Sequence, residues 1–589
     1  MKKIKSSSGY SPAFRSVVLI LLVTISCSPE SEKRISILAT TDLHGLLLHY
    51  DYIEKRAPAA SLANVSTYVK EVRRNNPAVI LLDNGDNLQG QPQVYYYNFI
   101  DTTSPHLISE VMNFMRYDAV TAGNHDIEAG HQVYDRLAGE YNFPMLAANA
   151  VNVGDKKPYF KPYTIIERGG VRVAVMGLIT PAVPNWLPPE LYRGMTFEDM
   201  RESAEKWMPV ILREKPDVVI GLFHSGWDTA GNDSLSFENG SMSVAYNVPG
   251  FHVIFNGHDH NVANEKFVNR RGDTILILNG GSRAEKVARA DVIVRSGKSG
   301  TGKVTAAGTI ISSSGYEPDP EFAELFSARH NDLNKYVSRV IARSSEDISS
   351  RDSYFGPSAF VDLIHTVQLD ISGADLSFSA PLSFDVRINR GDVTVADMFK
   401  LYRYENMLYT MELTGAEIRR YLEYSYSLWV NTMKSPDDLL LKLRVDNEGN
   451  PVLVNGKAWL LNFPYNFDSA AGIMYQVDVS KPEGERVLID SFTDARPFEE
   501  LGRYRVALNS YRGNGGGGHL ESGAGLSRDQ MRERLIKSTD KDLRFYIMSY
   551  LEENKKIDPV PLNNWKIVPE KWVKPATERE KELLFGKTK

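Results

Sequence analysis

Five short apolar runs in the first half of the chain each end in Asp, Asn or His. The runs cover residues 35–40, 79–82, 119–122, 218–223 and 253–255. In the same order, they lead into Asp42-Leu43-His44, Asp83-Asn84-Gly85-Asp86, Gly123-Asn124-His125-Asp126, His224 and Asn256-Gly257-His258-Asp259-His260. A short run rich in β-branched residues predicts a buried strand, and the carboxyl ends of neighbouring parallel strands share one edge of a sheet. The pattern therefore predicts one site assembled by a sheet.

Segments with helical spacing lie between these runs. Apolar residues recur three to four positions apart in residues 62–72, which end before Asn75-Asn76-Pro77, and again in residues 107–115. Residues 171–178 and 274–278 predict two further strands. Alternation of strands and helices predicts an α/β layered domain over residues 33–315.

The composition changes after residue 296. Gly, Ser and Pro are frequent in residues 297–302 and 312–320, and apolar residues at helical spacing in 321–342 predict a linker helix within 316–345. Residues 346–535 predict a second, α+β domain, with a helix over 413–428, strands over 474–479 and 504–508, and a glycine cluster at 513–518. The charged, proline-containing residues 536–589 predict a C-terminal tail that wraps the domain.

Composition excludes some partners. The chain has 589 residues, enough for three to four domains at ~150 residues each or for two larger ones. Its 68 basic and 74 acidic side chains give a net charge of −6. No basic field is present to hold a nucleic-acid backbone, so polymeric nucleic acid is not the expected partner, whereas a single nucleotide is compatible. The sequence does not indicate an oligomeric state.

The N-terminus predicts export. Basic residues in Met1–Lys5 precede an apolar run over 17–25 and then Ser26-Cys27, which holds the only cysteine of the chain. We predict a signal peptide over residues 1–26 and lipidation of Cys27, which resembles the bacterial lipoproteins. The protein would then be an outer-membrane, periplasmic or cell-surface lipoprotein that meets the membrane only through its anchor. The alternative is a plain signal peptide with an unrelated cysteine. The run is too short for a spanning helix, which needs about 20 residues.

The residues at the strand ends favour a pair of metal ions. Residues two apart in an extended chain point to the same side, so Asp42 with His44 and His258 with His260 each offer two ligands. The candidate ligands are Asp42, His44, Asp86, Asn124, His224, His258 and His260. This mixture suits divalent zinc, manganese, cobalt or iron better than calcium. Two such ions acidify a bridging water and stabilise displacement at phosphorus. Each motif alone is often only a turn or a surface pair, and the combination of all five favours the metal site.

These five motifs resemble those of the metallophosphoesterase superfamily. The resemblance implies that Asp86 bridges the two metals. It assigns Asp42, His44 and His260 to one ion and Asn124, His224 and His258 to the other. It also implies that His125 stabilises the transferring phosphoryl group or protonates the leaving oxygen. Glu128, where relatives carry Asp, would support His125.

A second resemblance concerns the substrate. Residues 83–92, 401–406, 465–468, 472–478 and 509–512 are similar to the bacterial 2′,3′-cyclic-nucleotide phosphodiesterase/3′-nucleotidases, within a wider group that includes the 5′-nucleotidases. The resemblance implies that Phe467 and Tyr511 stack on the base and that Asn406 binds substrate. Two departures weaken a 5′-nucleotidase assignment. Gly517 replaces an Asp of the glycine loop, and Ser379-Ala380-Pro381 replaces a Gly-Gly-Ile-Arg stretch.

We therefore expect a layered β-sandwich-and-helix metallophosphoesterase domain, a linker helix and a second α+β nucleotide-binding domain. The expected function is hydrolysis of 2′,3′-cyclic and 3′-nucleotides by a metal-activated hydroxide. The alternatives are a 5′-nucleotidase or nucleotide-sugar (UDP-sugar) hydrolase and, without catalysis, a nucleotide-binding lipoprotein. All candidate ligands and His125 are filled by competent residues, which disfavours the last alternative.

Overall fold

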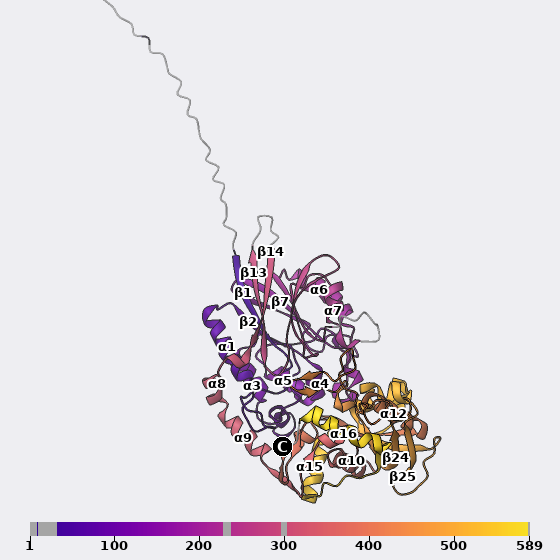
Figure 1. Ribbon diagram of the computed structural model, residues 1–589. Coiled ribbons are helices and arrows are strands. Elements are labelled where there is room, and N and C mark those ends of the chain that lie inside the picture. The colour runs from indigo at the N-terminus through magenta and orange to yellow at the C-terminus, as the bar shows by residue number, and fades with distance from the viewer. Residues whose placement is uncertain (1–8, 10–31, 228–236, 296–302, 587–589) are drawn as a thin grey trace, which may run out of the picture.

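The structure is a computed structural model that describes residue 9 and residues 32–227, 237–295 and 303–586. Two domains follow one another along the chain, and helices α8 and α9 run between them (Figure 1). The predicted signal segment, apart from residue 9, and Cys27 lie outside the described residues. None of the helices in the described ranges is long and apolar enough to cross a membrane.

The first domain is built on two six-stranded sheets packed face to face. The first sheet has the order β14-β13-β1-β2-β3-β4, and the second has the order β11-β12-β10-β9-β7-β6. The strands of the first are β1 (Glu32–Thr40), β2 (Val79–Asp83), β3 (Ala119–Thr121), β4 (Met145–Leu146), β13 (Lys286–Arg295) and β14 (Lys303–Ser312). Those of the second are β6 (Tyr163–Arg168), β7 (Val171–Ile179), β9 (Val218–His224), β10 (Val253–Asn256), β11 (Val262–Val268) and β12 (Thr274–Gly280). Side chains such as Ile37, Ile80, Val175 and Ile220 fill the space between the sheets.

Helices cover the outer face of each sheet. Alternate residues of a strand point to opposite faces, so Leu38 and Leu81 leave the inner core and contact α1 (Leu62–Asn75) and α3 (Leu107–Met115). On the second sheet, Met176 and Val219 pack with α6 (Met200–Arg213) and α7 (Ser241–Asn247). Apolar side chains on both faces explain why these strands lack an alternating pattern. The predicted layered α/β domain is confirmed.

Neighbouring parallel strands bring the polar motifs to common edges. Strands β1, β2, β3 and β4 are parallel in the first sheet, as are β7, β9, β10 and β12 in the second. Their carboxyl-terminal loops therefore lie together where the two sheets meet the second domain.

The predicted linker helix ends early. It is divided into α8 (Pro320–Leu325) and α9 (Ser327–Val337), and the prediction of helix up to residue 342 is wrong. Residues Val340–Ser344 form β15 instead, antiparallel to β19 (Gly391–Thr394). Apolar residues at positions 337 and 341 fit a helix as well as a strand, and pairing with β19 decides between them.

The second domain contains the C-terminal segment. Its main sheet has the order β23-β17-β26-β20-β27, with β17 (Leu376–Ser379), β20 (Met407–Thr414), β23 (Ser469–Ala471), β26 (Arg503–Asn509) and β27 (Leu535–Asp542). A smaller sheet joins β25 (Val487–Phe492), β24 (Ile473–Asp478) and β29 (Trp565–Val568). Helices α10 (Ala359–Ser372), α12 (Gly415–Trp429) and α15 (Leu543–Asn554) pack on these sheets.

The prediction of a wrapping tail over residues 536–589 is therefore wrong. Strands β27 and β29 belong to the two sheets, and Trp565 and Ile567 are buried. In α16 (Glu570–Phe585), the fully buried Glu580 accepts hydrogen bonds from the backbone N–H groups of Leu440 and Leu441 at 2.7 and 2.8 Å. Most charged residues of this segment are exposed, whereas Asp542, Arg544 and Glu580 are buried. The many charges mask the apolar pattern of the segment in the sequence.

Candidate metal centre and substrate pocket

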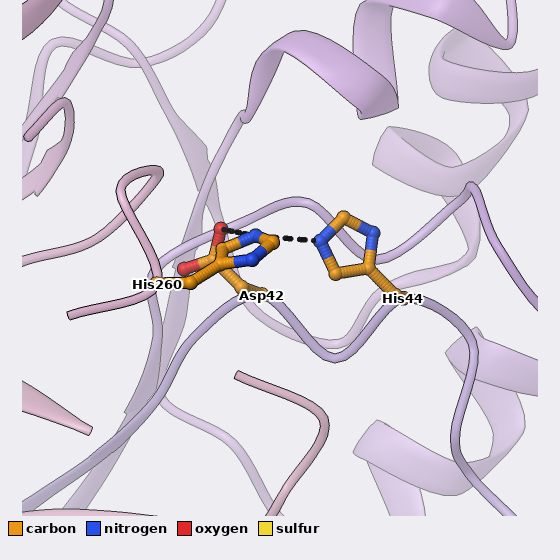
Figure 2. A group of neighbouring side chains, drawn as sticks. All are labelled: Asp42, His44 and His260. Atoms are coloured by element: carbon orange, nitrogen blue, oxygen red, sulfur yellow. Dashed lines mark hydrogen bonds and ion pairs between the residues drawn. The ribbon is translucent and has the colours of Figure 1, made fainter. Parts of the chain in front are cut away.

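The structure gathers the predicted metal ligands into two neighbouring clusters. In the first cluster, ligand atoms of Asp42, His44 and His260 lie within 4.8 Å of one another (Figure 2). In the second, those of Asp86, His224 and His258 do so too. Asn124, at the start of α4 (Asn124–Glu128), joins the second cluster through its Oδ1, which is 3.2 Å from His224 Nε2. Every predicted ligand thus has a place in one of the clusters.

In the first cluster, acceptor atoms face one another. His44 Nδ1 faces the carbonyl oxygen of Gln89 at 3.2 Å, so we assign the proton to Nδ1 and a lone pair to Nε2. That Nε2 is 3.0 Å from His260 Nε2, and His260 Nε2 is 3.4 Å from Asp42 Oδ1 (Figure 2). A cation between these atoms would satisfy all three.

The second cluster has the same character. His224 Nδ1 donates to the carbonyl oxygen of Asn84 at 2.6 Å, so a neutral His224 ring would carry its lone pair on Nε2. This Nε2 faces Asp86 Oδ2 at 3.1 Å and Asn124 Oδ1 at 3.2 Å, both of them oxygens that can accept. A mixture of imidazole nitrogens with carboxylate and amide oxygens as ligand atoms suits borderline divalent ions.

Asp42, Asp86 and His44 have the protonation states that metal binding needs, whereas His224 would have to lose a proton. Asp42 and Asp86 are buried. Burial raises the pKa of Asp86, but the charges of His224 and His125 outweigh it and hold that pKa well below its ordinary value. Burial, together with the nearby His125, lowers the pKa of His44 to about 3. Burial lowers the pKa of His224, but the charge of Asp86 raises it to about 9. Ionised carboxylates and a neutral imidazole are the forms that bind metals.

The backbone is strained at most of these positions. Asp42, His44, Asp86, His258 and His260 have φ values of 51°, 48°, 59°, 74° and 55°. Few residues with a side chain adopt this left-handed region, and such strain concentrates at functional sites. The turn of Asp86 also requires Gly123, because a Cβ there would lie 2.2 Å from Asp86 Oδ1. These sharp turns, at the carboxyl ends of the strands, direct the side chains of several ligands toward one another.

Two further aspartates support the loops, although the sequence analysis gave them no role. Asp126 accepts hydrogen bonds from the backbone N–H groups of Asp86, Asn87 and Gly123 at 3.0, 2.9 and 2.8 Å. Asp83 accepts from the backbone N–H of Gly85 and the side chain of Asn87 at 2.9 and 2.7 Å. Their signal in the sequence is a carboxylate inside a strand-end motif that already contains a ligand.

His125 is placed to act beside the clusters. Its Nδ1 lies 2.5 Å from Glu128 Oε2, the predicted supporting carboxylate. Burial lowers the pKa of His125, but Asp86 and Glu128 raise it to about 10. Its ring meets that of His44 edge-on at 5.5 Å. Because Nδ1 is occupied by Glu128, Nε2 is the atom available to a substrate.

The predicted role of Phe467 in base stacking is wrong. Phe467 is fully buried and stacks on Trp429 in the core of the second domain, with ring centroids 5.2 Å apart and planes at 6°. Two residues earlier, the half-buried Tyr465 meets Tyr404 edge-on at 6.3 Å. The 3-10 turn at Pro464–Asn466 turns the two rings in different directions, so that Phe467 points into the core and Tyr465 lies at the surface.

Tyr465 and Tyr511 both lie within the electrostatic influence of Glu238. Burial raises the pKa of both phenols, and the charge of Glu238 is a further cause for each. Glu238 Oε1 is 3.0 Å from His258 Nε2, so the carboxylate whose charge acts on both tyrosines contacts a candidate metal ligand. The sequence analysis did not identify Glu238 or Tyr465.

Arg512 links the loops that carry the two tyrosines. Its guanidinium donates to the carbonyl oxygens of Tyr465 and Gly516, the latter at 2.9 Å, and pairs with Asp468 at 2.9 Å. A Cβ at Gly516 would lie 2.6 Å from the Tyr511 ring, so glycine at this position allows the loop to pack closely against that ring. A Cβ at Gly517 would lie 2.3 Å from Arg512 Nη1, which explains why that position holds no Asp side chain.

Asn406 lies at the junction of the domains. Its carbonyl oxygen accepts a hydrogen bond from the backbone N–H of Leu543 at 2.7 Å, and its side chain is half-buried. Nearby, Gln89 of the first domain donates to the carbonyl oxygen of Arg403 at 3.0 Å. Contact between Asn406 and substrate stays a prediction.

A separate cavity of about 730 Å³ lies between α1, α3 and α8 and contains none of these residues. Four of its charged groups are bonded to protein. Lys70 pairs with Asp319 and Glu321 at 2.6 Å, and Arg73 donates to the carbonyl oxygens of Met115 and Arg116. This cavity offers no support for a substrate site.

Known proteins share both halves of the chain. Residues 35–262 match the calcineurin-like phosphoesterase family, and residues 340–522 match the 5′-nucleotidase C-terminal domain. A 2′,3′-cyclic-nucleotide 2′-phosphodiesterase/3′-nucleotidase of Yersinia enterocolitica is 25% identical, over 93% of this chain and 90% of that protein. The trifunctional nucleotide phosphoesterase protein YfkN of Bacillus subtilis is 26% identical over 92% of this chain, which spans only 39% of that relative.

A solved structure supports the fold. The 5′-nucleotidase precursor of Thermus thermophilus superposes with a TM-score of 0.60 at 20% identity, covering 91% of this chain and all of the other. Family matches and fold agree with the geometry of the clusters. The chain is a phosphoester hydrolase that joins a calcineurin-like phosphoesterase domain to a 5′-nucleotidase C-terminal domain.

Proposed function

We propose that the chain hydrolyses nucleotides as a 2′,3′-cyclic-nucleotide phosphodiesterase and 3′-nucleotidase. The observation that carries the proposal is the pair of His/Asp clusters that could each hold a metal ion, together with His125. Two partly exposed tyrosines of the second domain, Tyr465 and Tyr511, add to it. Relatives from Yersinia enterocolitica, Haemophilus influenzae and Salmonella typhimurium that carry this name align with more than nine-tenths of the chain.

The proposed site holds two divalent ions of zinc, manganese, cobalt or iron. Asp42, His44 and His260 would hold one ion, Asn124, His224 and His258 would hold the other, and Asp86 would lie between them. When bound, such ions activate a water and neutralise phosphoryl charge. His125 contributes a proton at Nε2 to the phosphoryl or leaving oxygen, while Glu128 holds Nδ1.

The base would bind between Tyr465 and Tyr511. A flat ring on each side accepts any base, because every base has a π face. Arg512 keeps the two loops at a fixed separation. Tyr465 thereby replaces Phe467 in the proposed pocket.

The second candidate is a 5′-nucleotidase or nucleotide-sugar hydrolase. A 5′-nucleotidase of Vibrio cholerae is 24% identical over 74% of this chain and 84% of that protein, which favours this candidate over unrelated activities. Residues 379–381 lack the arginine that would grip a doubly charged monoester.

We also propose export and an anchor at Cys27. The support is the basic segment, the nine-residue apolar run over 17–25 and the single cysteine that follows it. Cys27→Ser should move the protein from the membrane fraction to the soluble fraction or leave it unprocessed. Wild-type protein that already fractionates as soluble would exclude the anchor.

Asp86→Asn should lower kcat by at least ~100-fold and reduce the bound metal from two ions toward one. The substitution removes the carboxylate charge that both cations would share. Turnover and metal content are measured on the same sample, and the exposed Asp155→Asn is the control. Two bound ions together with normal turnover would refute the bridging role.

Tyr465→Ala and Tyr511→Ala should each raise KM for 2′,3′-cyclic AMP roughly five- to 150-fold, because a base stack contributes about 1–3 kcal/mol. Hydrolysis of bis-nitrophenyl phosphate, which has no base, should stay unchanged. Phe467→Ala should instead lower the Tm, as expected of a core residue. Equal losses on both substrates in the tyrosine variants would show that these rings only support the fold.

The substrate preference is testable with the wild-type enzyme. A cyclic diester carries one negative charge, whereas a 5′-monophosphate carries nearly two at pH 7. Because residues 379–381 provide no guanidinium for the second charge, kcat/KM should be higher for 2′,3′-cyclic AMP than for 5′-AMP, with 3′-AMP also accepted. The comparison uses one metal and one pH. A preference for 5′-AMP would favour the second candidate.

A further inference from the structure

The ring of His258 is held on three sides. Its Nε2 lies 3.0 Å from Glu238 Oε1. The ring of Trp186 stacks against it at 5.5 Å with planes at 28°, and the ring of His224 meets it edge-on at 5.4 Å. Only 11% of the His258 side chain is exposed, so its orientation is determined by protein contacts.

The contact with Glu238 selects one tautomer of His258. A carboxylate can only accept a hydrogen bond, so the proton of the neutral ring belongs on Nε2. The lone pair is then on Nδ1, the remaining nitrogen that His258 can offer to Asp86 and His224 in the second cluster. A carboxylate that holds the far nitrogen of a histidine is the usual outer support of a metal ligand.

Glu238 is itself tied to the second cluster. It lies in the short turn Phe237–Asn239, and its carbonyl oxygen accepts a hydrogen bond from Ser225 Oγ at 2.8 Å. The same Oγ accepts from the backbone N–H of Gly240 at 2.8 Å. Ser225 is fully buried and directly follows His224. The turn that carries Glu238 is thus bonded to His258 through its side chain and to the residue after His224 through its backbone.

The second domain contacts Trp186, the residue whose ring stacks on His258. The carbonyl oxygen of Trp186 accepts a hydrogen bond from Asn514 Nδ2 at 3.2 Å, and Asn514 lies three residues after Tyr511. Trp186 therefore connects the loop of the proposed base pocket with the histidine ring. Glu238 and Trp186 act on His258 from two separate segments of the chain.

We propose that Glu238 is a positioning residue that holds the Nε2–H of His258, keeps Nδ1 directed into the second cluster and so selectively raises the metal affinity of that cluster. The inference rests on the proposed dinuclear function. It gives Glu238 no contact with the reacting atoms. The proposal predicts that metal binding by the first cluster, with Asp42, His44 and His260, does not depend on Glu238.

The test measures metal binding by Glu238→Ala and Glu238→Gln in the full-length protein. Each protein is dialysed against buffered free Mn²⁺ over a range of concentrations, and the bound metal is counted by mass spectrometry. The affinity for the ion in the second cluster should fall about 10- to 100-fold in Glu238→Ala, while the ion in the first cluster is retained. Glu238→Gln should lie between the alanine variant and wild type, because its amide oxygen can still accept from Nε2–H.

The control is Glu265→Gln, an exposed carboxylate on β11, which should bind two ions as wild type does. Two ions with wild-type affinity in Glu238→Ala would overturn the positioning role, as would equal weakening of both ions. If Glu238→Ala does not fold, the same criteria apply to Glu238→Gln. A wild-type protein that binds fewer than two ions would instead refute the proposed dinuclear function, so the two failures are distinguishable.

Discussion

The structure depends on holding two ionised carboxylates inside the protein. Asp42 and Asp86 are buried, and an unpaired charge there would cost far more than a folded domain can offset. Imidazoles from other strand ends surround them, and Asp126 binds the backbone that turns around Asp86. The sheets, the left-handed turns and the short loops all serve to place these groups at one edge. Two divalent ions would more than neutralise these carboxylates and leave a positive charge that attracts phosphate.

The second domain completes the site from the opposite side. Gln89 donates to the carbonyl oxygen of Arg403, and Tyr95 Oη donates to Asp542 at 2.9 Å, so polar contacts join the domains close to the clusters. The ring of Tyr95 also packs edge-on against Phe399 at 5.4 Å. In the proposed function, phosphorus chemistry and base recognition would come from different domains, and one metal centre would serve nucleotides of several kinds.

Sequence reasoning located the metal centre because strand ends leave a local signature. An apolar run followed by Asp-x-His reports both the strand and the direction of two side chains. The same reasoning failed for Phe467, since nothing local distinguishes it from Tyr465 before the 3-10 turn assigns one ring to the core. It also failed for residues 565–568, where pairing with a strand ninety residues earlier determines the structure. Glu238 could not be found from the sequence because it lies 20 residues before His258, and only the fold brings the two side chains together.

Arg512 has a consequence for the thermodynamics of recognition. One buried guanidinium binds carbonyl oxygens of both tyrosine loops, so the backbone on each side of the proposed slot between Tyr465 and Tyr511 would be fixed before any base enters it. The two loops would then lose little conformational entropy on binding, which reduces the ordering cost that opposes the stacking energy. A slot of fixed width also makes ring thickness, which all bases share, the selected property. Discrimination among purines and pyrimidines would have to come from the edges of the base.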